Sequence, residues 1–104
     1  MKTAFIQSLT HAFEAHAQHT EGSVEFWLAR DLQHLLGYSK WDNFLNAVLK
    51  AKTACEVSGH DTQNHFAGVS KMVDLGSGSR REVPDIMLTR YACYSISHIK
   101  RHRL

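Results

Sequence analysis

Hydrophobic side chains recur along this chain with two different spacings, and the change of spacing marks the expected elements. In residues 3–19 they recur at every third or fourth position, as on one face of a helix. Residues 28–36 and 40–57 show the same spacing, and Gly37 between them indicates a tight turn. Residues 24–27 alternate instead and are rich in strand-forming side chains, which predicts a short strand.

The second half of the pattern predicts a β-hairpin followed by a helix. Residues 68–84 form two apolar-patterned runs around a Gly/Ser turn at 76–79, and Lys71 interrupts the apolar face of the first run. Pro84 closes the hairpin, and Asp85 is placed to cap a final helix that contains residues 88–99. With about four helices, one short strand and one hairpin, we expect an α+β fold. A winged-helix-like arrangement, with the hairpin as the wing, is one such fold.

The two helices around Gly37 leave an alternative open. Two helices joined by a tight turn can be a helix-turn-helix, the motif that places its second helix in the major groove of DNA. They can equally be a plain helical hairpin, and the spacing alone favours this second option because such hairpins are common in small helical cores.

Length and composition indicate one globular domain over residues 1–104. The chain has 104 residues and is 43% hydrophobic, which suits one modest core. No apolar run approaches the roughly 20 residues that a membrane helix needs, and the N-terminus does not resemble a signal peptide, so we expect a cytoplasmic protein without a membrane partner. Cys55 and Cys93 are too few for a disulfide scaffold, and we expect free, partly buried thiols.

Charge is distributed unevenly along the chain. The formal net charge is +2; residues 1–39 carry a net −2, whereas residues 40–104 carry ten Lys/Arg against six Asp/Glu. An anion-binding surface is therefore expected in the second part of the chain. The candidate DNA-binding residues lie on the hairpin, at the start of the 40–57 helix and on the last helix with its basic tail: Lys71, Arg80, Arg81, Arg90, Lys40, Lys100, Arg101 and Arg103.

Structural roles compete with DNA contact at several of these positions. Arg80 and Arg81 can be solvated charges that protect a sheet edge from pairing with other chains. Arg90 can pair internally, for example with Asp85 or Glu82.

Catalytic and metal-binding patterns are missing from the sequence. There is no phosphate-binding loop with its Lys-Ser/Thr, no Gly-x-Ser-x-Gly and no His-Glu-x-x-His. His11, His16 and His19 lie on one expected helix, but no further ligand completes a zinc pattern, and surface histidines are the favoured interpretation. We expect no enzymatic activity, no metal and no cofactor.

Two groups of residues carry a family resemblance. Residues 26–32, Phe-Trp-Leu-Ala-Arg-Asp-Leu, followed by Leu-Gly-Tyr at 36–38, resemble the opening of the BRO-type N-terminal (BRO-N) domain of viral, phage and bacterial proteins. The resemblance spans residues 24–94. Further matching positions include Trp41, Phe44, residues 50–52, 54–55, 58–59, 65–66, 71–73 and 76–78, Arg81 and the heptapeptide 88–94.

The resemblance implies a DNA-associated role without a cofactor or a catalytic residue. BRO-type domains are linked to DNA binding and occur in antirepressor-like phage proteins. Within this superfamily the closer match is to a bacterial protein of the DNA-damage response that restrains a recombinase filament. Family members continue beyond the position of Tyr94 into a longer helix and a C-terminal region, so the chain resembles a truncated homologue that keeps only the N-terminal module.

Two functions are weighed on this basis. The first is a non-enzymatic DNA-binding module of the DNA-damage response. The alternative is an antirepressor-like protein-interaction module that contacts a repressor or recombinase without binding DNA. A homodimer is also considered, because truncation would leave apolar surface around Ile96 and Ile99 uncovered.

Overall fold

Five helices and a four-stranded antiparallel sheet make up the computed structural model, which describes the backbone of residues 2–102 and the side chains of residues 9–99. The expected α+β class is confirmed. In chain order the elements are α1 (Lys2–Ala15), β1 (Gln18–His19), β2 (Glu25–Leu28), α2 (Ala29–Leu35), α3 (Trp41–Val57), α4 (Thr62–His65), β3 (Phe66–Asp74), β4 (Arg80–Leu88) and α5 (Arg90–His102).

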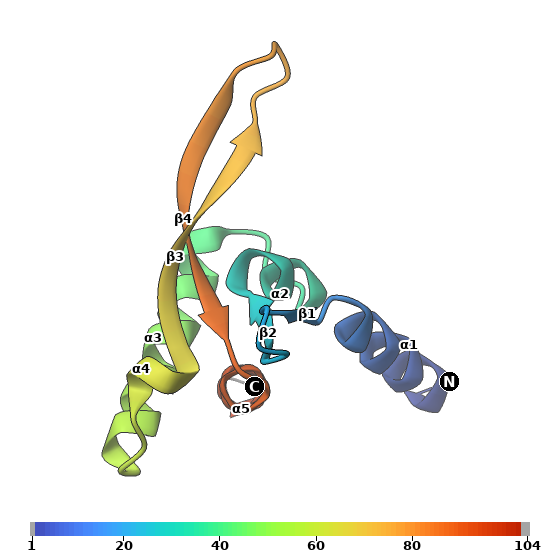
Figure 1. Ribbon diagram of the computed structural model, residues 1–104. Coiled ribbons are helices and arrows are strands. Elements are labelled where there is room, and N and C mark those ends of the chain that lie inside the picture. Colours follow the sequence, from blue (N-terminus) through green and yellow to red (C-terminus); the bar gives the residue numbers. More distant parts are fainter. Residues whose placement is uncertain (1, 103–104) are drawn as a thin grey trace.

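The sheet has the strand order β1-β2-β4-β3. The β3–β4 hairpin pairs over nine residues on each strand, from Phe66 opposite Leu88 to Asp74 opposite Arg80. In contrast, β2 pairs with β4 only at its base, where Trp27 lies opposite Leu88. Most of the hairpin therefore extends past the other strands, and Figure 1 shows it projecting away from the helices.

The core lies where the base of the hairpin meets α2, α3 and α5. Helix α3 contributes a stripe at three- and four-residue steps, namely Phe44, Ala47, Val48, Ala51 and Cys55. Trp27, Leu32, Leu88 and Ile96 are each at most 1% exposed in the same cluster. Phe44, Val48 and Cys55 lie at the helical spacing that the sequence shows, whereas Leu49, at the same spacing, is 50% exposed.

Both cysteines are buried and free, as expected. Burial raises the pKa of the Cys93 thiol to about 12, so this side chain stays protonated and unreactive at neutral pH.

Several element boundaries differ from the sequence prediction. Helix α1 ends at Ala15, and residues 18–19 pair with β2 instead of extending the helix. In the following turn, Ser23 takes the left-handed conformation, at φ 63°. The segment between α3 and β3 contains the short helix α4, which begins where Asp61 Oδ1 accepts a hydrogen bond from the backbone N–H of Gln63 at 3.0 Å.

Pro84 lies inside strand β4 and does not close the hairpin, which corrects the prediction. Proline cannot donate a ladder hydrogen bond, so it is tolerated only where one side of the strand has no strand neighbour. That condition holds here, because β2 reaches only Met87 and Leu88 of β4. The hairpin therefore runs to Leu88, and this residue belongs to the strand and not to the final helix.

The last helix also differs from expectation in its cap and in its apolar face. Thr89, and not Asp85, caps α5: its hydroxyl accepts a hydrogen bond from the backbone N–H of Ala92 at 3.2 Å. Ile96 is 0% exposed and Ile99 packs against the core. The uncovered surface expected at Ile96 is therefore absent, and α5 packs on α3, β2 and β4.

Candidate nucleic-acid interface

The outer part of the hairpin, residues 70–82, is called the arm below. Nearly all of its residues are exposed; only Lys71 and Val73 are half-buried. The tip is closed by a hydrogen bond from the backbone N–H of Leu75 to the carbonyl oxygen of Ser79 at 2.9 Å. Gly76 and Gly78 have φ values of 93° and 79°, a conformation that glycine adopts without steric cost. The arm is thus a regular β-ribbon with a narrow tip.

The two faces of the arm carry different charges. Paired residues share a face and neighbours along a strand point to opposite faces, so Arg80 lies with Asp74 while Arg81 lies with Val73 and Lys71. Arg80 Nε lies 3.5 Å from Asp74 Oδ1, and Glu82 shares that face. The face of Lys71 and Arg81 carries two positive charges and no acidic side chain within the arm.

Lys71 also joins the arm to helix α2. Its Nζ lies 3.6 Å from Asp31 Oδ1, and both side chains are about one-third exposed, at 34% and 27%. A partly exposed ion pair of this kind contributes little to the stability of the fold and is weakened by salt. Lys71 therefore lies half-buried where the arm meets α2, whereas Arg81 is exposed further out along the arm.

The base of the arm is held by the first turn of α2. The N-cap position of this helix, Leu28, provides no side-chain cap. Instead Asp85, which is 2% exposed, reaches across from β4: its Oδ1 accepts hydrogen bonds from the backbone N–H groups of Arg30 at 3.1 Å and Ile86 at 2.8 Å. Asp85 thus caps α2 through the N–H of a residue 55 positions earlier in the chain. A carboxylate at a helix N-terminus accepts a hydrogen bond from a free N–H and is attracted by the positive end of the helix dipole.

Arg30 completes the connection between arm, α2 and α3. Its Nε donates a hydrogen bond to the carbonyl oxygen of Pro84 at 2.9 Å, and its guanidinium lies 4.1 Å from the centre of the Trp41 ring. The base of the arm, the start of α2 and the start of α3 are therefore connected through one side chain. This arrangement sets the direction in which the arm leaves the body.

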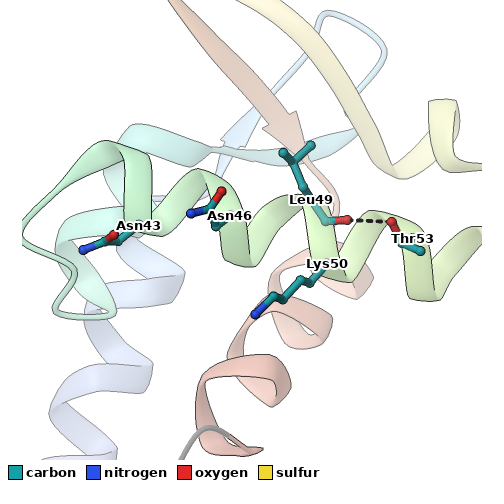
Figure 2. Close-up of a pocket in the computed structure, with 5 residues that line it drawn as sticks. All are labelled: Asn43, Asn46, Leu49, Lys50 and Thr53. Atoms are coloured by element: carbon teal, nitrogen blue, oxygen red, sulfur yellow. Dashed lines mark hydrogen bonds between the residues drawn. The ribbon is translucent and has the colours of Figure 1, made fainter.

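Helix α3 presents a second polar surface. Asn43, Asn46, Leu49, Lys50 and Thr53 line one shallow depression, and Figure 2 shows all five side chains projecting from this single helix. Because every lining residue belongs to one helix, the depression is an outer helix face and not an enclosed cavity. Thr53 Oγ1 donates to the carbonyl oxygen of Leu49 at 3.0 Å, while the two asparagines and Lys50 are exposed. We call these five residues the outer face of α3.

The α2–turn–α3 unit has the order of helix, glycine turn and helix that a plain helical hairpin shares with a helix-turn-helix. Helix α2 ends at Leu35, Gly37 takes the left-handed conformation at φ 77°, and α3 starts at Trp41 after the exposed Lys40. In a helix-turn-helix, the exposed face of the second helix contacts base edges, and asparagine and lysine are residue types that make such contacts. Asn43, Asn46 and Lys50 were missed at the sequence level, although their three- and four-residue spacing opposite the apolar stripe could have revealed them.

Arg90 belongs to a structural cluster and is not grouped with the arm. Its guanidinium pairs with Glu14 at 2.7 Å and with Glu25 at 2.8 Å, and it lies 5.0 Å from the centre of the Trp27 ring. Helix α1, strand β2 and helix α5 are connected by these contacts. The internal pairing expected for Arg90 is therefore present, with Glu14 and Glu25 in place of Asp85 or Glu82.

This cluster predicts a loss of stability in acid. Hydrogen bonds from Arg90, followed by its charge, hold the pKa values of Glu14 and Glu25 below the ordinary value of 4.5. A lowered folded-state pKa stabilises the fold above the unfolded value and ceases to do so as the pH falls through the folded value. Urea unfolding between pH 6 and pH 3 should therefore show stability decreasing below about pH 4.5.

The variant Arg90→Gln should reduce this pH dependence and lower the stability at pH 6, because it removes the charge that both glutamates face. Arg80→Gln, on an exposed pair of the arm, is the matched control and should leave the acid profile of the wild type unchanged. An Arg90→Gln profile that coincides with the wild type would contradict the assignment.

The remaining candidate residues cannot be placed in this interface. The side chains of Lys100 and Arg101 and the whole of Arg103 lie outside the described part of the chain. Among the described residues, no group of three or more His, Cys, Asp or Glu side chains could hold a metal ion. None of the helices, over the residues described, is long and apolar enough to cross a membrane.

Comparison with known proteins identifies the family of this chain. The model of the BRO family, N-terminal domain, matches residues 17–101, so this chain belongs to that family. Among individual proteins, the chain is 47% identical over 73 residues to DNA damage-inducible protein D of Escherichia coli (strain K12). The matched region is 70% of this chain but only 27% of that protein, so the chain spans about a quarter of the relative's length. The resemblance expected from residues 24–94 is thereby confirmed.

No solved structure matches this fold. The winged-helix-like arrangement consequently stays a prediction.

Proposed function

We propose that this chain is a non-enzymatic module that binds duplex DNA, through the basic face of the arm and the outer face of α3. The observation that carries the proposal is the exposed arm with Lys71 and Arg81 on one face, held at its base to α2 and α3 through Arg30. Arginine and lysine on an exposed ribbon suit contact with phosphates, whereas asparagine and lysine on a helix suit base edges. A role in the DNA-damage response is proposed from the similarity to DNA damage-inducible protein D.

The basic residues of the arm should differ in how much each contributes to the affinity for DNA. Arg81 has no acidic neighbour on its face of the arm, while Arg80 is paired with Asp74 and shares its face with Glu82. Arg81 is therefore the better phosphate contact, and Lys71 becomes available when salt or DNA displaces Asp31. Lys40 lies exposed at the start of α3 and is proposed as a further phosphate contact. We assign Arg90 a structural role.

The proposal predicts salt-dependent binding that depends on Arg81. Fluorescence anisotropy of a labelled duplex, titrated over a range of salt concentrations, should show affinity falling steeply with salt. Arg81→Ala should weaken binding by a similar factor for every DNA sequence and reduce the slope of log affinity against log salt by about 1. Arg80→Ala should have a smaller effect, because Asp74 partly neutralises this side chain.

Lys52→Ala is a matched control: Lys52 is exposed on α3 but lies outside the outer face, so the loss of one charge there should leave the slope close to wild type. Binding that does not respond to salt, or no binding even at low salt, would refute the proposal.

One observation favours the alternative of protein contact without DNA. An apolar groove lies between α1, α2 and α5, lined mainly by leucine and aromatic side chains: Leu9, Thr10, Phe13, Glu14, Leu32, Leu35, Leu36, Tyr94 and Ser97. Leucine and aromatic side chains around a groove are suited to a repressor or recombinase surface. Retention of such a purified protein on the immobilised chain after nuclease treatment, together with blank gel shifts, would favour this function over DNA binding.

A further inference from the structure

The tip of the arm combines an apolar side chain with the charges behind it. Leu75 is 55% exposed at the end of the β3–β4 hairpin, and the residues that follow it, Gly76, Ser77 and Gly78, are too small to cover it. The hydrogen bond between Leu75 and Ser79 closes the turn, so this side chain is presented by an ordered ribbon. An exposed leucine on a regular, projecting tip is suited to insertion into another molecule.

The distance between this leucine and the arginines corresponds to the depth of a DNA groove. Arg81 is paired with Val73, two residues before Leu75. At roughly 3.4 Å per residue, Leu75 lies about 7 Å further out along the ribbon than the level of Arg81. The minor groove is about 7.5 Å deep. When Arg81 is level with the phosphates at the mouth of the groove, Leu75 is level with the base edges at its floor.

Two features favour the minor groove. The tip residues at 76–79 are glycine and serine, which offer little for reading the hydrogen-bond pattern of the major groove. Arg80 and Arg81 point to opposite faces of the ribbon. A ribbon that enters a groove therefore has one arginine on the side of each of the two phosphate backbones. Arg80 shares its face with Asp74 and Glu82, but its ion pair with Asp74 is exposed and weak, so its guanidinium can turn from Asp74 to a phosphate.

We infer that the arm enters the minor groove of duplex DNA and that Leu75 inserts between two base pairs, bending the duplex. This inference rests on the proposed DNA binding and adds the groove, the inserted residue and the mechanical result. A two-stranded ribbon is wider than the roughly 6 Å of an undistorted minor groove. Apolar side chains that part a base step kink DNA toward the major groove, by about 20–90°, and this kink opens the minor groove. Pyrimidine–purine steps such as TA and CA unstack most easily and should be the preferred sites.

The test uses the full chain and a short duplex with donor and acceptor dyes at its ends and one 2-aminopurine next to a central TA step. Wild-type protein should raise energy transfer between the ends and increase 2-aminopurine fluorescence. Leu75→Ser should lose both signals while keeping the salt slope of binding, because no charge changes. Leu75→Phe should retain both, since phenylalanine also serves as a wedge.

Val57→Ser is the matched control, because Val57 is 82% exposed at the other end of α3 and lies outside the arm. It should behave as wild type. Binding without bending, or equal bending by Leu75→Ser, overturns the insertion of Leu75 and leaves DNA binding intact. In a duplex with uracil in place of thymine, loss of the bend would indicate contact with the thymine methyl group in the major groove. This result would also overturn the insertion of Leu75 from the minor groove. Failure of the wild type to bind any duplex refutes both the inference and the proposed function.

Discussion

Replacing Trp27 with alanine should lower the free energy of unfolding by about 3–5 kcal/mol, the usual cost of removing a buried tryptophan or phenylalanine. Trp27 is 0% exposed and stacks on Phe13 of α1 with ring centres 4.3 Å apart. Its Nε1–H donates a hydrogen bond to the carbonyl oxygen of Phe13 at 2.7 Å. A domain of this size is stable by roughly 5–15 kcal/mol, so the variant should be close to unfolding at 25 °C.

Trp27→Phe separates packing from hydrogen bonding. It keeps an aromatic ring for the stack with Phe13 and removes only the indole N–H and part of the volume, so we expect a cost of about 1–2 kcal/mol. Urea unfolding followed by circular dichroism measures both variants. If Trp27→Ala lost less than about 1.5 kcal/mol, the packing of α1 on β2 described above would be wrong.

Replacing Asp85 with alanine should cost roughly 2–4 kcal/mol and should loosen the base of the arm. The carboxylate accepts hydrogen bonds from the backbone N–H groups of Arg30 and Ile86, and alanine would leave both without this acceptor. Hydrogen exchange should then quicken at the first turn of α2 and at the adjacent part of β4. Urea unfolding gives the change in stability.

Two variants make this prediction specific. Asp85→Asn keeps an oxygen at the position of Oδ1 and should cost less than half as much as alanine. Asp74→Ala, on the same hairpin but exposed, should stay within about 0.5 kcal/mol of wild type. Equal effects at positions 74 and 85 would show that the cap on α2 contributes nothing.

Trp27 and Arg30 lie close together in the chain, because β2 and α2 follow each other without a linker. Trp27 faces α1 and α5, and Arg30 lies three residues later at the base of the arm. One short segment therefore positions the N-terminal helix on one side and the arm on the other. A change at this junction should alter DNA binding through the direction of the arm, even though neither side chain is proposed to touch DNA.

Much of the candidate site was accessible from the sequence because it depends on local chemistry. Gly76 and Gly78 predicted the turn, and alternation along residues 68–84 predicted its strands, since both signals act between near neighbours. The exposure of Arg80 and Arg81 followed from their position beside that turn. The outer face of α3 was missed because exposed asparagines carry no distinctive signal until the buried stripe opposite them is known.

The roles of Asp85 and Arg90 could not be obtained in the same way. Asp85 was expected to cap the helix that follows it, but its partner lies 55 residues earlier; Arg90 was expected to pair nearby, but its partners lie 76 and 65 residues earlier. A carboxylate or a guanidinium accepts any complementary group within reach, and sequence spacing does not reveal which groups the fold brings near.

The amino-acid sequence was sufficient to predict the class of fold, the hairpin with its glycine turn, the free cysteines and the BRO family. All of these depend on local backbone preference, on periodicity or on direct similarity. The sequence did not predict that the arm projects from the body. It also did not predict which face of the arm is basic or which arginines form internal pairs. The physical reason is that strand register and long-range ion pairs arise when distant segments pack against one another, and no single segment contains that information.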